Sequence, residues 1–172
     1  MFKRWFTRRK PPRLQVLMVC TANICRSPMA EAVLVAKLHR LGLQDAVAVD
    51  SAGTHGFQKG TPADRRAVEA AERRGYQVAG IRSRPVVADD FSRFDLVLAM
   101  DRNNLASLTE RCPAAQHDRL GLLLPHAPGL PTDEVPDPYY GSPAAFEHAL
   151  NLIEPACDGV VRVLQKRLAT LA

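Results

Sequence analysis

The sequence is poor in cysteine and contains no long apolar run. Its 172 residues include four scattered cysteines, too few for a disulfide scaffold, so we expect a reducing compartment such as the cytoplasm. No apolar stretch approaches the roughly 20 residues of a membrane-spanning helix. No apolar segment follows the basic N-terminus either, so we expect no secretory signal. The length and the 47% hydrophobic content fit one globular domain.

Acidic residues are absent from the first 13 positions, whereas six basic residues lie there. The remaining 17 basic residues are balanced by 18 acidic ones, so the net charge of +5 belongs to this terminal segment. A nucleic-acid-binding protein normally carries its basic surface on the folded domain, so we expect no nucleic-acid partner. Residues 1–13 are predicted to form a disordered tail outside a domain of residues 14–172. The alternative is weak contact with an anionic membrane surface or with an acidic partner, through a segment that carries Phe2, Trp5 and Phe6 among its basic residues.

Short apolar segments alternate with helical patterns along the chain. Strands are predicted at residues 14–19, 46–50, 94–99 and 119–124. Helices are predicted at residues 28–41, 62–74, 101–111 and 142–169. This alternation predicts an α/β domain whose four-stranded parallel sheet carries helices on both faces. Ligands bind at the carboxyl ends of such strands, where Cys20, Ser51 and Asp101 lie.

The segment from Cys20 to Pro28, with the sequence CTANICRSP, joins the first predicted strand to the first predicted helix. So short a loop turns tightly, and its backbone N–H groups can converge on a phosphate-sized anion at the helix N-terminus. Arg26 adds a planar fork of donors that suits two phosphate oxygens. These positive groups favour a thiolate at Cys20. Ser27 is predicted both as the N-cap and as a hydrogen-bond donor to that thiolate.

Residues 20–28 resemble the Cys-x-Gly-Asn-x-Cys-Arg-Ser-Pro motif of the low-molecular-weight protein tyrosine phosphatases, with Ala22 in place of the glycine. Further segments that resemble this family follow in the same order, at residues 51–57, 89–101 and 136–141. Together the resemblance covers about residues 14–168. It implies a bacterial-type protein-tyrosine phosphatase with a phosphate-binding loop after the first strand and no cofactor.

The resemblance also implies a division of catalytic roles. Cys20 would attack phosphorus, and Arg26 with the loop amides would hold the equatorial phosphate oxygens. Asp137 would protonate the leaving group and later deprotonate water. Asp133 and Glu134 lie on the same proline-rich segment and are its rivals for that role.

The remaining site residues implied by the resemblance bind or surround the substrate. They are Thr21, Ala22, Asn23, Ile24, Cys25, Ser27, Phe57, Tyr139 and Tyr140. Ser51 and Asp101 would support the loop. The aromatic side chains would form walls that fit an aryl phosphate, although Phe57 and one of the tyrosines could instead belong to the core.

Two departures from the family pattern affect the loop. If position 22 requires a positive φ, Ala22 costs about 1 kcal/mol of strain. The family often has a histidine where this chain has Ile81, so Asn23 is expected to be supported by Ser51 alone.

Cys25 is predicted to protect Cys20 by forming a reversible disulfide with it. The alternative is that Cys25 only fills space in the core as a buried apolar side chain.

Two other functions compete with the phosphatase. A thiol-dependent arsenate reductase would use the same loop for arsenate, but Cys112 and Cys157 form no evident disulfide relay. A non-catalytic phosphate-binding or redox module would be favoured only if a catalytic residue were missing. By analogy, the phosphotyrosine protein that serves as substrate would be a bacterial tyrosine kinase.

No metal is expected, because the histidines of the sequence do not show the spacing of metal ligands. The five histidines are His39, His55, His117, His126 and His148.

Overall fold

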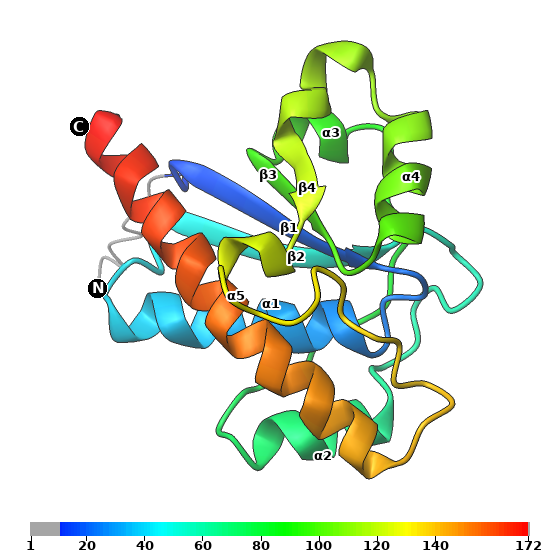
Figure 1. Ribbon diagram of the computed structural model, residues 1–172. Helices are drawn as coiled ribbons and strands as arrows, with labels where there is room; N and C mark the ends of the chain where they lie inside the picture. The colour runs from blue at the N-terminus through cyan, green and yellow to red at the C-terminus, as the bar shows by residue number, and fades with distance from the viewer. Residues whose placement is uncertain (1–10, 172) are drawn as a thin grey trace, which may run out of the picture.

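Four parallel strands in the order β2-β1-β3-β4 form the centre of the fold (Figure 1). The structure is a computed structural model that describes residues 11–171, so most of the predicted tail lies outside the described residues. The strands are β1 (Leu14–Cys20), β2 (Val47–Gly53), β3 (Leu96–Ala99) and β4 (Leu120–Leu122). This sheet confirms the predicted α/β class and places the end of β1 in the middle of the carboxyl edge.

The central strand β1 is buried on both faces because its apolar side chains alternate. Val16, Met18 and Cys20 point into the larger core cluster. Leu17 and Val19 point into a second cluster on the opposite face. Since neighbouring residues of a strand face opposite ways, a continuous apolar run needs a layer of helices on each side.

The helices supply those two layers, as predicted (Figure 1). On one face lie α1 (Arg26–Arg40) and α5 (Pro143–Thr170), with α2 (Arg65–Glu72) packed against both. On the other face lie α3 (Asp90–Arg93) and α4 (Arg102–Arg111). Two short 3-10 helices, η1 (Ala114–Arg119) and η2 (Leu124–His126), flank β4. None of the helices within residues 11–171 is long and apolar enough to cross a membrane.

Several predicted boundaries differ from the structure. β2 continues past Asp50 to Gly53, because residues 51–53 pair in register with residues 18–20 of β1. The second helix is shorter than residues 62–74 and begins only after Asp64, whose carboxylate accepts a hydrogen bond from the Arg66 N–H at 2.9 Å. Strand pairing and capping override the apolar pattern at these ends.

Arg13, which was predicted to be the last residue of the tail, is instead attached to the domain. The backbone N–H of Arg13 donates to the carbonyl oxygen of Ala46 at 2.8 Å. Its guanidinium donates to the carbonyl oxygen of Leu168, near the end of α5, at 3.1 Å. Arg13 therefore links the first strand to the last helix.

Candidate active site

The loop of residues 21–25 connects β1 to α1 and lies directly against the end of β2. The N–H of Thr54 donates to the Cys20 carbonyl and that of His55 donates to the Thr21 carbonyl, each at 2.9 Å. Gly53 makes this close approach possible, because a Cβ added there would lie 2.7 Å from the Thr21 carbonyl oxygen. The loop is therefore held from outside by β2 and the residues after it.

The backbone N–H groups of residues 21–27 are the distinctive feature of this loop. Within residues 11–171, none of them donates a hydrogen bond to a protein acceptor. Several of these residues line the pocket next to the start of α1, where unpartnered backbone N–H groups favour a bound anion. Asn23 takes a positive φ of 57°, which turns the loop and which asparagine tolerates well. Ala22 has no positive φ, so the expected strain at position 22 does not arise.

Cys20 and Ser27 face each other across the base of the loop. The Ser27 Oγ lies 3.1 Å from the Cys20 Sγ, and Cys20 is only 3% exposed. The prediction that Ser27 is the N-cap is wrong, because α1 begins at Arg26 and Cys25 precedes it without a capping side chain. Ser27 instead directs its hydroxyl toward the thiol and toward Asn23.

Arg26 is a buried cation at the first position of α1. One guanidinium nitrogen donates to Asp101 at 2.5 Å and to the Val135 carbonyl at 3.0 Å. The other donates to Asp137 at 2.9 Å. Burial alone would lower the pKa of Arg26, but the nearby negative charges of Cys20, Asp101 and Asp137 raise it, so the guanidinium stays charged. Asp101 also caps α4, because its carboxylate accepts a hydrogen bond from the Asn104 N–H at 2.7 Å.

The three candidate acids separate clearly in space. Asp137 lines the pocket, pairs with Arg26 and accepts a hydrogen bond from the Tyr139 N–H at 3.1 Å. Asp133 forms an ion pair with the Arg102 guanidinium, and Glu134 accepts a hydrogen bond from the Arg102 N–H at 2.6 Å. The rivals therefore contact the start of α4, whereas Asp137 pairs with Arg26 and lines the same pocket as Cys20.

A pocket of about 320 Å³ opens above Cys20. Its lining residues are Cys20, Thr21, Ala22, Ile24, Cys25, Arg26, Phe57, Gln58, Asp137, Tyr139 and Tyr140. Tyr139 and Tyr140 pack edge to face, with ring centroids 4.9 Å apart. The alternative that Phe57 belongs to the core is wrong, because it is 68% exposed at the rim. Asn23, Ser27 and Ser51 lie buried beneath the loop.

Beneath the loop, Asn23 makes more contacts than expected. Its side-chain amide donates to both Ser27 and Ser51, at 2.9 Å and 2.8 Å. Its oxygen accepts a hydrogen bond from the backbone N–H of Arg84 at 3.0 Å. The expectation that Asn23 would hydrogen-bond with Ser51 alone is therefore wrong, because Ser27 and the backbone of Arg84 are also its partners.

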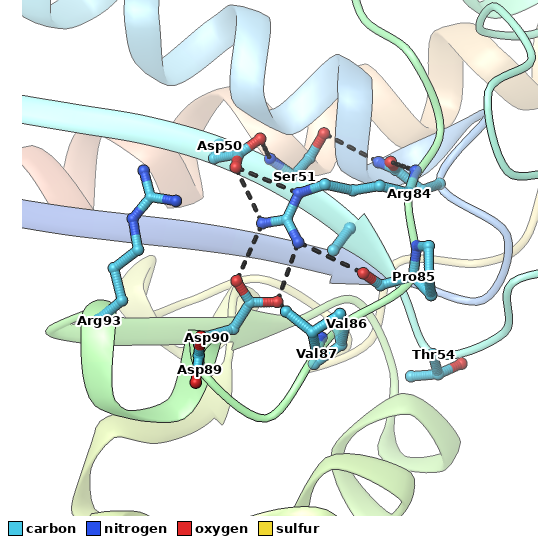
Figure 2. A network of polar contacts seen from close by, with 12 residues as sticks. Asp50, Ser51, Thr54, Arg84, Pro85, Val86, Val87, Asp89, Asp90 and Arg93 are labelled. Atoms are coloured by element: carbon cyan, nitrogen blue, oxygen red, sulfur yellow. Dashed lines mark hydrogen bonds and ion pairs between the residues drawn. The ribbon is translucent and has the colours of Figure 1, made fainter.

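Arg84 occupies the centre of an ion-pair network below this loop (Figure 2). Its guanidinium pairs with Asp50 of β2 at 2.8 Å and with Asp90 of α3 at 2.9 Å. Asp90 is 3% exposed and also accepts a hydrogen bond from the Val87 N–H. Sequence reasoning missed Arg84, because its partners lie 34 and 6 positions away in a chain rich in arginine.

Sequence reasoning also missed the attachment of the Asp137 segment to α2. Arg66 donates to the carbonyl oxygens of Tyr139 and Gly141, at 2.9 Å and 3.2 Å. Its guanidinium is held by Asp64 at 2.8 Å and lies 4.7 Å from the ring centre of Phe146. Hydrogen bonds from Arg66 lower the pKa of Asp64, so this carboxylate stays ionised. The capping position of Asp64 is visible in the sequence, but the contacts of Arg66 depend on tertiary packing.

Cys25 lies beside Cys20 in the pocket lining, and both thiols are free. Burial raises the pKa of the Cys25 thiol well above its ordinary range, and the negative charges of Asp64 and Cys20 add to this effect. Cys25 is therefore protonated, whereas the Cys20 Sγ lies 3.1 Å from the Ser27 hydroxyl. Among residues 11–171, no cluster of three or more side chains could hold a metal ion.

Known proteins resemble this chain in both sequence and fold. Residues 15–170 match the family described as low molecular weight phosphotyrosine protein phosphatase. A low molecular weight protein-tyrosine-phosphatase of Streptomyces coelicolor is 38% identical over 157 residues, covering 90% of this chain and 95% of that protein. The crystal structure of a protein tyrosine phosphatase from Entamoeba histolytica is 38% identical with a TM-score of 0.86, covering 89% of this chain and 97% of that one. The crystal structure of YfkJ from Bacillus subtilis is 34% identical and has the same TM-score of 0.86. The match covers 92% of this chain and 98% of that one. This chain belongs to the low molecular weight phosphotyrosine protein phosphatase family.

Proposed function

We propose that this chain is a protein-tyrosine phosphatase that hydrolyses phosphotyrosine and other aryl phosphomonoesters through a phosphocysteine. The observation that carries the proposal is the set of unpaired N–H groups of residues 21–27, which surround Cys20 together with the buried cation of Arg26. Such an arrangement stabilises the negative charge that spreads over the equatorial phosphate oxygens in the transition state.

The first chemical step transfers the phosphoryl group to Cys20. The thiolate attacks phosphorus, a P–S bond forms, and the bond between phosphorus and the aryl oxygen breaks. Asp137 donates its proton to the departing oxygen. In the second step Asp137 accepts a proton from water, the water oxygen bonds to phosphorus, and the P–S bond breaks to restore the thiolate.

Two features of Asp137 support this double role. Its side chain is 51% exposed, so leaving groups and water both have access to it. Its carboxylate lies 2.9 Å from Arg26, which also orients the phosphate. When phosphate binds, the guanidinium nitrogen that contacts Asp137 can donate to a phosphate oxygen instead, while the other nitrogen stays paired with Asp101.

The pocket wall favours an aromatic substrate. Phe57 and Tyr140 come from separate segments that line the pocket, and 68% and 98% of their surfaces are exposed. A phenyl ring entering between such walls gains apolar contact, whereas a phosphoserine side chain is too short to span them. Purified protein should therefore cleave a phosphotyrosine peptide at least about tenfold faster than a matched phosphoserine peptide.

The preference for the phosphotyrosine peptide is measured as the rate of phosphate release from each peptide, in a buffer that contains a chelator and no added metal. A protein that releases no phosphate from either peptide, yet reduces arsenate in the presence of a thiol, would contradict the proposal. The positions of the remaining thiols argue against that second activity. Cys112 follows α4, and the fully buried Cys157 contacts the Ala30 carbonyl, so neither joins the pocket lining.

Cys25 is proposed to protect the nucleophile from irreversible oxidation. Peroxide converts a Cys20 thiolate to a sulfenic acid, and the Cys25 sulfur then displaces water to form a disulfide. Mild peroxide should inactivate the enzyme, phosphate should slow inactivation, and a dithiol should restore activity. Cys25→Ser should recover less than about half as much activity as the wild type. The measurement is the activity that each protein regains after dithiol treatment. Equal recovery in the wild type and in Cys25→Ser would show that Cys25 is only a buried apolar side chain.

The cellular setting is also proposed on chemical grounds. A thiolate nucleophile works only where it stays reduced, which favours the cytoplasm. A phosphotyrosine protein, such as a bacterial tyrosine kinase, is the proposed partner, and Cys20→Ser can capture it from lysate. For the residues before Arg13 the proposal remains a tail outside the catalytic domain, whereas Arg13 itself is bonded to the domain. Sedimentation with anionic vesicles tests the contact of this tail with membranes.

A further inference from the structure

Arg66, in the first turn of α2, is a partly buried cation that the proposed reaction steps do not use. Its Nη2 donates to the Tyr139 carbonyl oxygen at 2.9 Å, and its Nη1 donates to the Gly141 carbonyl oxygen at 3.2 Å. Both acceptors belong to the acid segment, residues 136–141, which carries Asp137. Within residues 11–171, no other side chain from outside the acid segment hydrogen-bonds to its backbone.

The carboxylate of Asp64 fixes the Arg66 guanidinium in this orientation. Its Oδ1 accepts from the Arg66 Nε at 3.0 Å, and its Oδ2 accepts from Nη2 at 2.8 Å. The guanidinium carbon also lies 4.7 Å from the ring centre of Phe146 on α5, whose first turns pack beside α2 (Figure 1). All three guanidinium nitrogens of Arg66 therefore donate to protein oxygens, which a lysine ammonium group cannot reproduce.

The same turn is attached to the loop that follows Cys20. The backbone N–H of Asp64 donates to the Ile24 carbonyl oxygen at 2.8 Å, and Ile24 lines the pocket. Asp64 also caps α2 through the backbone N–H of Arg66 at 2.9 Å, so the two residues form one bonded turn. This turn joins the phosphate-binding loop on one side to the acid segment on the other, and its bonds set the distance between them.

The backbone of Tyr139 connects Arg66 to the acid. Its carbonyl oxygen accepts from Arg66, and its N–H donates to the Asp137 Oδ1 at 3.1 Å. The other carboxylate oxygen, Oδ2, lies 2.9 Å from the Arg26 guanidinium. When a phosphate oxygen takes over that Arg26 nitrogen, the Tyr139 N–H is the contact that still orients Asp137. Oδ2 is then free to carry the proton for the departing oxygen.

We propose that Arg66 is a positioning residue for the general acid, which fixes the acid segment relative to the phosphate-binding loop so that Asp137 meets the leaving-group oxygen. Without Arg66, the carbonyl oxygens of Tyr139 and Gly141 would turn toward water, and the acid segment would lose its fixed distance from the loop. A displacement of about 1 Å can slow a reaction by about 100-fold. This inference rests on the proposed function, because it assigns Arg66 a role in the same proton transfer.

Arg66→Ala tests the proposal through the leaving group. The measurement is the single-turnover rate of the full-length protein with phenyl phosphate and with p-nitrophenyl phosphate. The rate with phenyl phosphate should fall about tenfold or more, because the phenolate needs a well-placed proton as it leaves. The rate with p-nitrophenyl phosphate should fall less than about threefold, because its leaving group departs with little protonation. An equal loss with both substrates, or no loss with either, would overturn the proposal.

The Asp137→Asn background separates the placement of the acid from general damage to the pocket. If Arg66 acts through Asp137, adding Arg66→Ala to Asp137→Asn should change the phenyl phosphate rate by less than about twofold. A loss as large as that caused by Arg66→Ala alone would show that Arg66 supports the pocket by another route, and the proposal would be wrong. Protection of Arg66→Ala against thermal unfolding by phosphate should match that of the wild type, because the loop N–H groups are unchanged.

Arg65→Ala and Arg66→Lys are the matched controls. Arg65 lies on the same turn, but 91% of its side chain is exposed and it pairs with Glu69, so Arg65→Ala should leave both rates unchanged. Arg66→Lys keeps the charge, yet one ammonium group cannot reach Asp64 and both carbonyl oxygens, so its loss should again be larger with phenyl phosphate. If thermal melting shows that Arg66→Ala does not fold, Arg66→Lys decides: an equal loss with both substrates, or none, would overturn the proposal.

The same rates distinguish a failure of this inference from a failure of the proposed function. If Asp137→Asn slows phenyl phosphate more than p-nitrophenyl phosphate while Arg66→Ala does not, only the role of Arg66 is wrong. If the wild type releases no phosphate from either substrate, the proposed function is wrong and the role of Arg66 is refuted with it.

Discussion

Cys20→Ser will lose nearly all turnover of aryl phosphates, by more than about 1,000-fold in kcat. A cysteine thiol can supply a thiolate nucleophile, but a serine hydroxyl is not ionised near neutral pH and is a poor nucleophile there. Because serine is close in size, phosphate should still bind the N–H groups of residues 21–27. Release of p-nitrophenol measures turnover, and protection against thermal unfolding by phosphate measures binding.

Arg26→Lys should lose turnover to a similar extent although the charge is kept. The buried guanidinium contacts Asp101, Val135 and Asp137 with two different nitrogens, which a single ammonium group cannot reproduce. Cys112→Ser serves as the control. Cys112 lies outside the pocket lining, so this variant should retain wild-type activity.

Turnover that persists in Cys20→Ser would rule out the nucleophile assignment and would favour a non-covalent or different thiol mechanism.

Asp137→Asn will lose rate in proportion to the basicity of the leaving group. A phenolate without activating groups needs a proton as its bond to phosphorus breaks, so phenyl phosphate hydrolysis should fall by about 10² to 10⁴-fold. The p-nitrophenolate ion leaves with little protonation, so its release should fall much less in the first step. Single-turnover rates over a series of substituted phenyl phosphates measure the slope of this dependence.

The matched control for Asp137 is Asp133→Asn. Asp133 belongs to the same proline-rich segment but forms an ion pair with Arg102, so its replacement should leave the slope unchanged. A uniform loss across the whole series in Asp137→Asn, or a steeper slope in Asp133→Asn, would transfer the acid role away from Asp137. Asparagine has nearly the same shape as aspartate, so the loop held by Arg66 should keep its conformation.

The class of fold and the position of the phosphate-binding loop could be predicted from the sequence because both depend on local patterns. β1 is a continuous apolar run, and such a run predicts a strand that is buried on both faces. The short loop after Cys20 and the helix beginning near Pro28 predict converging N–H groups at the end of that strand. Each of these signals lies within a few residues of the feature that it predicts.

The supporting contacts depend on residues that are distant along the chain, and only tertiary structure brings them together. Glu31 and Ser51 are separated by 20 positions, and Arg66 and Tyr139 by 73. The sequence alone therefore determined the α/β class, the nucleophilic cysteine motif and a short set of candidate acids. Tertiary structure decided which acid faces the thiol and which polar groups lie beneath the loop, because strand pairing and helix packing set distances that no local pattern contains.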